Sequence, residues 1–108
     1  MFQAVVVQTT TETESEAEAI AELLLERRLA ACVQITPIRS RYVWRGQVAR
    51  ADEQLLAIKT RAELFEAVRE AIRAQHSYET PEILGVAAAA VDPAYLAWLT
   101  EATRTAEN

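Results

Sequence analysis

Residues 76–82, His-Ser-Tyr-Glu-Thr-Pro-Glu, form the densest group of chemically capable side chains in the sequence. The segment holds the only histidine, together with a phenol, two carboxylates and a proline, and it lies between a helical pattern over 61–75 and an apolar run over 83–91. A plain connector would be richer in glycine, serine and asparagine. Side chains with this much hydrogen-bonding capacity are typical of binding loops. We therefore expect a functional site to be built around this loop.

Three residues outside the loop could also take part in chemistry. Cys32 is the only cysteine and lies in an alternating strand pattern, where a free cysteine is most often a small core residue. Lys59 is the single lysine among 11 basic residues, and its compact ammonium differs from the planar arginine fork; an exposed strand end is the plain alternative. Trp44 is expected near a hairpin end, where a monomer cannot easily bury it, so an interface role is favoured.

Composition limits the class of protein. The 108 residues predict one domain spanning 1–108, and a hydrophobic content of 51% is enough for a core. A net charge of −5 argues against general nucleic-acid binding, which needs a cationic face. A single cysteine fits a reducing cytoplasm. No stretch approaches the roughly 18 apolar residues of a membrane span, and the N-terminus resembles a strand rather than a signal peptide.

The first half of the chain predicts a strand, a helix and a long hairpin. Residues 2–8 are apolar and β-branched, as in a buried strand. Overlapping capping boxes place the start of a helix within 11–16. Residues 31–44 read as a strand with a bend or a sheet edge at Pro37, because proline cannot donate a ladder bond. Arg45-Gly46 makes the turn, and residues 47–59 return as the second strand.

The second half predicts a helix, a strand and a last helix. Thr60 to Glu63 fits another capping box, and His76 falls at the C-terminal end of the helix that follows. Residues 83–91 are expected to be a strand. Asp92-Pro93 fits an N-cap followed by proline at the first helical position, and residues 100–108 are expected to fray.

This order predicts an α+β fold of the ferredoxin-like split βαβ kind, βαββαβ plus a short C-terminal helix. It has a four-stranded antiparallel sheet with two helices on one face. Few residues remain to cover the other face, so we expect oligomerisation through the sheet.

Five linked segments resemble one known family, the CutA divalent-cation-tolerance proteins. They are Leu29 to Val33, Tyr42 to Gly46, Ile58 to Arg61, His76 to Glu82 and Tyr95 to Leu99. The resemblance runs over essentially the whole chain. It implies a tight homotrimer that pairs long hairpins between subunits, and a cytoplasmic role in tolerance of copper and other divalent ions. It also implies a likeness in architecture to the trimeric nitrogen-regulatory PII signal proteins.

The resemblance and the ligand chemistry together suggest a site. We expect His76, Glu79 and Cys32 to bind copper or another divalent cation, with no organic cofactor, and Lys59, Tyr78, Glu82 and Trp44 to line a cleft between subunits. Cys32 and His76 are the only soft or borderline ligands, so a tetrahedral site would need Glu79 or Glu82, a neighbouring subunit, or water. Serine at 77, where the family usually has proline, is expected to loosen the loop.

Three function classes follow. The first is a metal-binding or metal-tolerance protein with weak sites between subunits. The second is a PII-like module that binds a small ligand or partner in the same clefts. The third, an enzyme that uses Cys32 or His76, is the least favoured, because no sequence feature marks the thiol as activated. The chain is therefore expected not to be an enzyme.

Overall fold

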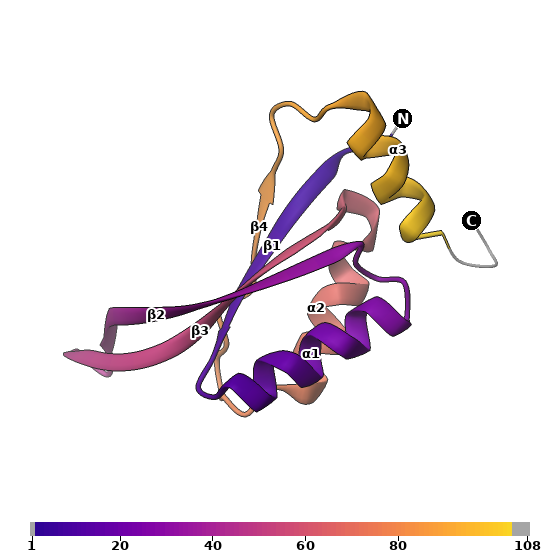
Figure 1. Ribbon diagram of the computed structural model, residues 1–108. Helices are drawn as coiled ribbons and strands as arrows, with labels where there is room; N and C mark the ends of the chain where they lie inside the picture. Colours follow the sequence, from indigo (N-terminus) through magenta and orange to yellow (C-terminus); the bar gives the residue numbers. More distant parts are fainter. Residues whose placement is uncertain (1, 105–108) are drawn as a thin grey trace.

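The computed structural model describes residues 2–104 as an α+β fold whose elements follow the predicted order (Figure 1). The strands are β1 (Ala4–Thr11), β2 (Cys32–Trp44), β3 (Gln47–Arg61) and β4 (Leu84–Ala87). The helices are α1 (Glu14–Glu26), α2 (Phe65–Gln75), which follows a single 3-10 turn (Ala62–Leu64), and α3 (Pro93–Ala102).

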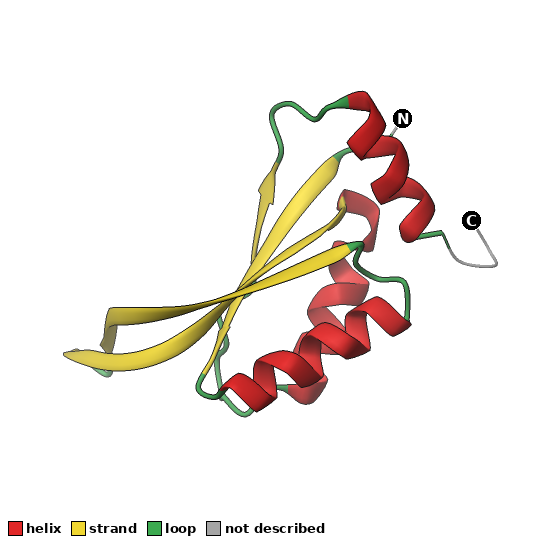
Figure 2. Ribbon diagram, in the orientation of Figure 1, coloured by secondary structure: helices red, strands yellow, loops and turns green. Residues whose placement is uncertain are grey.

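The four strands form one antiparallel sheet in the order β2-β3-β1-β4. The edge position of β2 confirms the expectation for Pro37, since an edge strand tolerates a residue without an N–H. Helices α1 and α2 lie together on one side of the sheet (Figure 2). Side chains that alternate along the strands meet the apolar stripes of these helices in the core. The main members are Val5, Val7, Leu56 and Ile58 from the sheet and Ala17, Ile20, Leu24, Val68, Ala71 and Ile72 from the helices.

Strand β4 approaches helix α2 closely at one glycine. A Cβ atom built on Gly85 would lie 3.0 Å from Cε1 of Phe65, so a larger residue there would push β4 away from the start of α2.

The β2–β3 hairpin extends beyond the rest of the sheet. Pairing of β1 with β3 ends at Thr11 and Gln54, so residues 38–53, here named the hairpin arm, form a two-stranded ribbon (Figure 1). The molecule measures 44 × 26 × 21 Å as a result. Arg45 and Gly46 form the turn with positive φ angles of 52° and 77°, as a tight two-residue hairpin turn requires. The predicted long hairpin and its turn are confirmed.

Helix α3 packs at the end of the sheet where β3 finishes. Arg61 is 2% exposed; its Nε donates to Thr103 Oγ1 at 2.8 Å and its NH2 group donates to the Thr103 carbonyl at 2.9 Å. The predicted N-cap is present, since the Asp92 carboxylate accepts from the N–H groups of Ala94 and Tyr95.

Three boundary predictions are wrong. Strand β1 begins at Ala4 and continues to Thr11, because its threonines pair with β3. The Thr60 hydroxyl donates to the Leu29 carbonyl at 2.6 Å instead of capping a helix, and β3 runs on to Arg61. Strand β4 covers only Leu84–Ala87 of the predicted 83–91.

The prediction that residues 100–108 fray is also wrong for residues 100–104. Helix α3 continues to Ala102, and Thr103 is fully buried because Arg61 holds it. Residues 105–108 lie outside the described part of the chain.

Candidate functional site

His76 ends helix α2, as predicted, and connects the 76–82 loop to strand β1. Its Nε2 lies 2.7 Å from the Thr10 carbonyl oxygen, and its Nδ1 accepts the Tyr78 N–H at 3.1 Å. A backbone N–H can only donate, so Nδ1 carries no proton and Nε2 is the donor to Thr10. Both ring nitrogens are therefore used within the chain. His76 can bind a metal only by giving up one of these hydrogen bonds.

Ser77 ties the loop to helix α1. Its N–H donates to Glu16 Oε2 at 2.7 Å, and its hydroxyl lies 3.2 Å from Glu16 Oε1. In the same first turn Thr13 caps the helix, accepting the Glu16 N–H at 3.2 Å, as the capping box predicted. The expectation that serine loosens the loop is not supported, since Ser77 makes two hydrogen bonds to a helix that precedes it by about 60 positions.

Tyr78 joins the loop to the hairpin arm. Its phenol donates to Glu53 Oε2 at 2.7 Å, and Glu53 is only 7% exposed. Burial raises the pKa of the Tyr78 phenol well above its usual range, and the hydrogen bond to Glu53 and the negative charge of Glu53 raise it further. Tyr78 is therefore a proton donor throughout the physiological pH range.

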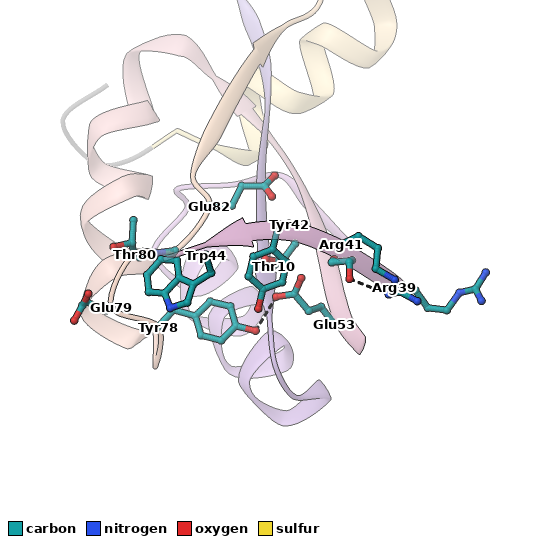
Figure 3. A pocket seen from close by; sticks show the side chains of 12 residues that line it. Thr10, Arg39, Arg41, Tyr42, Trp44, Glu53, Tyr78, Glu79, Thr80 and Glu82 are labelled. Atoms are coloured by element: carbon teal, nitrogen blue, oxygen red, sulfur yellow. Dashed lines mark hydrogen bonds between the residues drawn. The ribbon is translucent and has the colours of Figure 1, made fainter. Parts of the chain in front are cut away.

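A cleft of about 720 Å³ opens between the 76–82 loop and the hairpin arm (Figure 3). Its walls combine aromatic rings, three carboxylates and two guanidinium groups. The lining residues are Thr10, Arg39, Ser40, Arg41, Tyr42, Trp44, Glu53, Tyr78, Glu79, Thr80, Pro81 and Glu82. Of the predicted residues, Tyr78, Glu82 and Trp44 line this cleft, and so does Glu79 from the expected metal set.

Lys59 and Cys32 lie away from this cleft within one chain. They face each other across β2 and β3, level with Val6, whereas His76 contacts Thr10. Four residues along β1 separate these levels by about 13 Å. Cys32 is half-buried, and its neighbour Val33 is the residue that packs on the core, so the alternative interpretation of Cys32 as a core residue is not supported.

Lys59 lines a second cavity of about 430 Å³ beside helix α3, where its Nζ lies 6.0 Å from the Tyr95 ring centroid. Within residues 2–104, no three histidine, cysteine, aspartate or glutamate side chains gather as a metal site. The expected set of His76, Glu79 and Cys32 is therefore not assembled within one chain.

Glu53 is the site residue that the sequence reasoning missed. It occupies the same face of β3 as Leu55 and Ala57, which is the sheet face opposite the core residues Leu56 and Ile58, so an acidic residue in line with apolar residues on the face that the helices leave uncovered was the available signal. Thr10 was also missed, because it contributes its backbone carbonyl to His76.

Comparison with known proteins identifies the family. The profile of the CutA1 divalent ion tolerance protein family matches residues 5–102. The chain belongs to this family. The divalent-cation tolerance protein CutA of Thermus thermophilus is 42% identical over 99 residues, which cover 91% of this chain and 96% of that protein. The chloroplastic CutA protein of Arabidopsis thaliana is 37% identical over 102 residues, but the chain spans only 56% of its length.

Solved CutA structures share the fold. The structure described as the periplasmic divalent cation tolerance protein CutA from Archaeoglobus fulgidus matches with a TM-score of 0.92 at 39% identity, covering 94% of this chain and 99% of that one. The Thermus thermophilus protein matches with a TM-score of 0.90 at 41% identity, covering 94% and 99%. No helix within residues 2–104 is long and apolar enough to cross a membrane. Because one CutA structure is described as periplasmic, the cytoplasmic location stays a prediction.

Proposed function

We propose that this CutA chain acts in divalent-cation tolerance as a cytoplasmic homotrimer that binds divalent ions, copper foremost, weakly in clefts between its subunits. Family membership supports the tolerance role. The carboxylates of the cleft carry the binding part of the proposal. Glu79 and Glu82 are exposed on the loop, and Glu53 lies deeper in the same cleft.

The weakness of binding follows from the incomplete ligand set. Carboxylate oxygens bind divalent ions, but a tight transition-metal site needs several well-placed ligands, which residues 2–104 of one chain do not supply. Groups from a neighbouring subunit or water would complete the set. The absence of a free imidazole nitrogen and of cleft sulfur argues against special affinity for copper(I).

Exposed apolar surface supports the trimer. Val43 and Val48, paired near the end of the hairpin arm, are 73% and 72% exposed, and Leu84 and Val86 of β4 are exposed on the sheet face opposite α1 and α2. Such surface is typical of an interface that an isolated chain leaves uncovered. Contact of the hairpin arm with another subunit would place the cleft at the boundary between chains.

Calorimetric titration with copper(II) and zinc tests the metal proposal. Copper(II) should bind more tightly than zinc, following the Irving–Williams order. The double variant Glu79→Gln/Glu82→Gln should weaken copper binding by about tenfold or more, and Glu66→Gln/Glu101→Gln, on exposed helix surfaces, should leave it unchanged. Equal binding by the cleft variant and wild type would contradict the assignment.

Electron paramagnetic resonance of bound copper(II) defines the part played by His76. Oxygen-only coordination is expected while the imidazole keeps its bonds to Thr10 and Tyr78. Nitrogen hyperfine splitting that disappears in His76→Ala would instead make His76 a ligand and show that one of its hydrogen bonds opens.

The second candidate is a PII-like module that binds a small ligand in the cleft. The observation that favours it is the aromatic wall of Tyr42, Trp44 and Tyr78, which a metal ion does not need. A small-ligand titration followed by tryptophan fluorescence, with a chelator present to remove metal ions, separates this function from metal binding. A fluorescence change that saturates under these conditions supports the small-ligand function.

A further inference from the structure

Glu53 carries a buried charge that the described part of the chain does not balance. Its side chain is 7% exposed, and its one hydrogen-bond donor is the neutral phenol of Tyr78. No ion pair joins it to a basic residue among residues 2–104. A carboxylate withdrawn from water without a cationic partner is unfavourable, so this position attracts a cation.

The basic residues that line the cleft do not supply that cation. The Arg39 side chain extends away from Glu53 (Figure 3). The Arg41 NH1 group donates to the Ser40 carbonyl at 2.9 Å.

Aromatic rings line the same cleft and suit a cation of a particular kind. Tyr42, Trp44 and Tyr78 contribute to its walls together with Glu53 (Figure 3). The face of an aromatic ring attracts cations, most strongly when they are weakly hydrated and bulky. Trp44 already shows this behaviour, because the Arg45 guanidinium lies 5.6 Å from its ring centroid.

Near Glu53, the cleft suits an organic cation better than a metal ion. Oε2 of Glu53 is shared with the Tyr78 phenol, and no second acidic or histidine group joins it in a three-ligand cluster among the described residues. A volume of about 720 Å³ is far larger than one ion requires. Rings contribute attraction over a broad surface, which matches a substituted ammonium.

We propose that the cleft between the 76–82 loop and the hairpin arm binds a small organic ammonium compound, with Glu53 as the counter-charge and Tyr42, Trp44 and Tyr78 as the aromatic walls. The proposal rests on the second candidate function and names its ligand class; it is tested separately from the metal proposal, which uses the same cleft. The Tyr78 hydroxyl holds the carboxylate in place, and the polar residues Thr10, Ser40 and Thr80 line the same cleft.

The test uses choline and tetramethylammonium as probes, with a chelator present and ionic strength held constant. Trp98→Phe, on helix α3, leaves Trp44 as the one tryptophan whose fluorescence reports binding. A saturable change with a dissociation constant on the order of 1 mM is expected for choline. The uncharged isostere 3,3-dimethylbutan-1-ol should bind about tenfold more weakly or worse, because it lacks the charge.

Two variants locate the site. Glu53→Gln should weaken choline binding by about tenfold or more, whereas Glu101→Gln, on the exposed surface of α3, should not change it. Saturation-transfer NMR of the choline methyl groups on the wild-type protein gives a readout that needs no variant to fold. Equal affinity for choline and its neutral isostere, or no saturation with either ammonium probe, would overturn the proposal.

Light scattering distinguishes a competing occupant. If a basic side chain of a neighbouring subunit neutralises Glu53, then Glu53→Gln changes the oligomeric state and choline does not bind, which also overturns the proposal. Copper binding is measured separately without the chelator, so the failure of one proposal is distinguishable from the failure of the other.

Discussion

At the scale of single residues, hydrogen-bond partners decide what each polar group does. Thr9 lies in the core, fully buried, and its hydroxyl is the one buried side-chain polar atom of the described chain without a partner. Thr11, two residues on and equally buried, donates its hydroxyl to the Thr13 carbonyl at 2.8 Å. A buried threonine hydroxyl therefore destabilises the fold at position 9 and stabilises it at position 11.

The first prediction compares these two threonines. Thr9→Val keeps the shape and removes an unpaired hydroxyl, so it should raise the free energy of unfolding by about 1 kcal/mol. Thr11→Val removes a hydrogen bond, and it should lower the same quantity by about 1 kcal/mol. Denaturant titrations of both variants measure the effect. A Thr9→Val protein less stable than wild type would mean that the hydroxyl has a partner in solution.

The second prediction concerns the Tyr78–Glu53 hydrogen bond. The pKa of Tyr78 is raised above the unfolded value of 10.0, so the folded state binds the proton more tightly. The stability from this bond is complete below pH 10 and is lost as the pH rises above it. Tyr78→Phe should be less stable at neutral pH by about 1–3 kcal/mol, because it leaves the Glu53 carboxylate without a donor.

Above pH 10 the gap between wild type and Tyr78→Phe should narrow. Denaturation midpoints measured from neutral pH to pH 11 check this, with Tyr95→Phe as a control for general tyrosine ionisation. A stability difference between wild type and Tyr78→Phe that is constant from neutral pH to pH 11 would exclude the proposed link between Tyr78 ionisation and stability.

The residues of the site were only partly predictable. The 76–82 loop could be identified because it concentrates hydrogen-bonding side chains in seven positions. The roles of His76 and Glu53 could not, because their partners Thr10 and Tyr78 are distant in sequence. A histidine and a cysteine in one chain suggested a shared ligand set, and only the strand register shows that His76 and Cys32 lie at different levels of the sheet.

At the scale of elements, one buried arginine fixes the C-terminal helix. Arg61 contacts Thr103 through two nitrogens, pairs with Glu63 at 3.2 Å, and lies 4.3 Å from the Phe2 ring centroid. These contacts join the start of β1, the end of β3 and the end of α3.

The third prediction replaces this arginine by lysine. Arg61→Lys keeps the charge but loses the fork geometry, so the free energy of unfolding should fall by about 1–3 kcal/mol. Amide exchange at residues 100–103 should accelerate. Arg69→Lys is the matched control, because its pair with Glu66 is exposed and should be worth less than about 0.5 kcal/mol. An equal fall in the free energy of unfolding for Arg61→Lys and Arg69→Lys would contradict a special structural role for Arg61.

Elements with strong local patterns were predictable, and their ends were not. The helices α1 and α3 began where their caps indicated, since Thr13 and Asp92 act on nearby backbone. The capping box at Thr60 failed because its hydroxyl reaches Leu29 across the fold. The alanine-rich stretch after β4 carries no signal that distinguishes the last paired residue, Ala87, from the next.

At the scale of the whole molecule, the hairpin arm has apolar side chains on both faces. Val43 and Val48 face one side, and Tyr42 and Trp44, each 43% exposed, face the other. The face with the two exposed valines is expected to be covered by another subunit, which agrees with the proposed trimer, and the rings on the other face line the cleft.

The fourth prediction couples unfolding to assembly. If subunits separate when they unfold, the melting midpoint should rise with protein concentration. Light scattering on dilute protein should give the trimer mass, and Val43→Asp should shift it to smaller species. Leu25→Asp, at an exposed position of helix α1, is the control and should leave the mass unchanged. A midpoint independent of concentration with reversible unfolding would argue against this coupling.

The position of β1 between β3 and β4 also determines which of its two edges can be paired first during synthesis. Val5 pairs with Thr60 on one side and with Ala87 on the other, so a growing chain exposes β1, α1 and the whole hairpin before β4 exists. Until β4 emerges, the free edge of β1 is a template that any other strand can join. Four late residues, Leu84–Ala87, close that edge. The nascent chain is therefore most vulnerable to wrong pairing just before its last quarter leaves the ribosome.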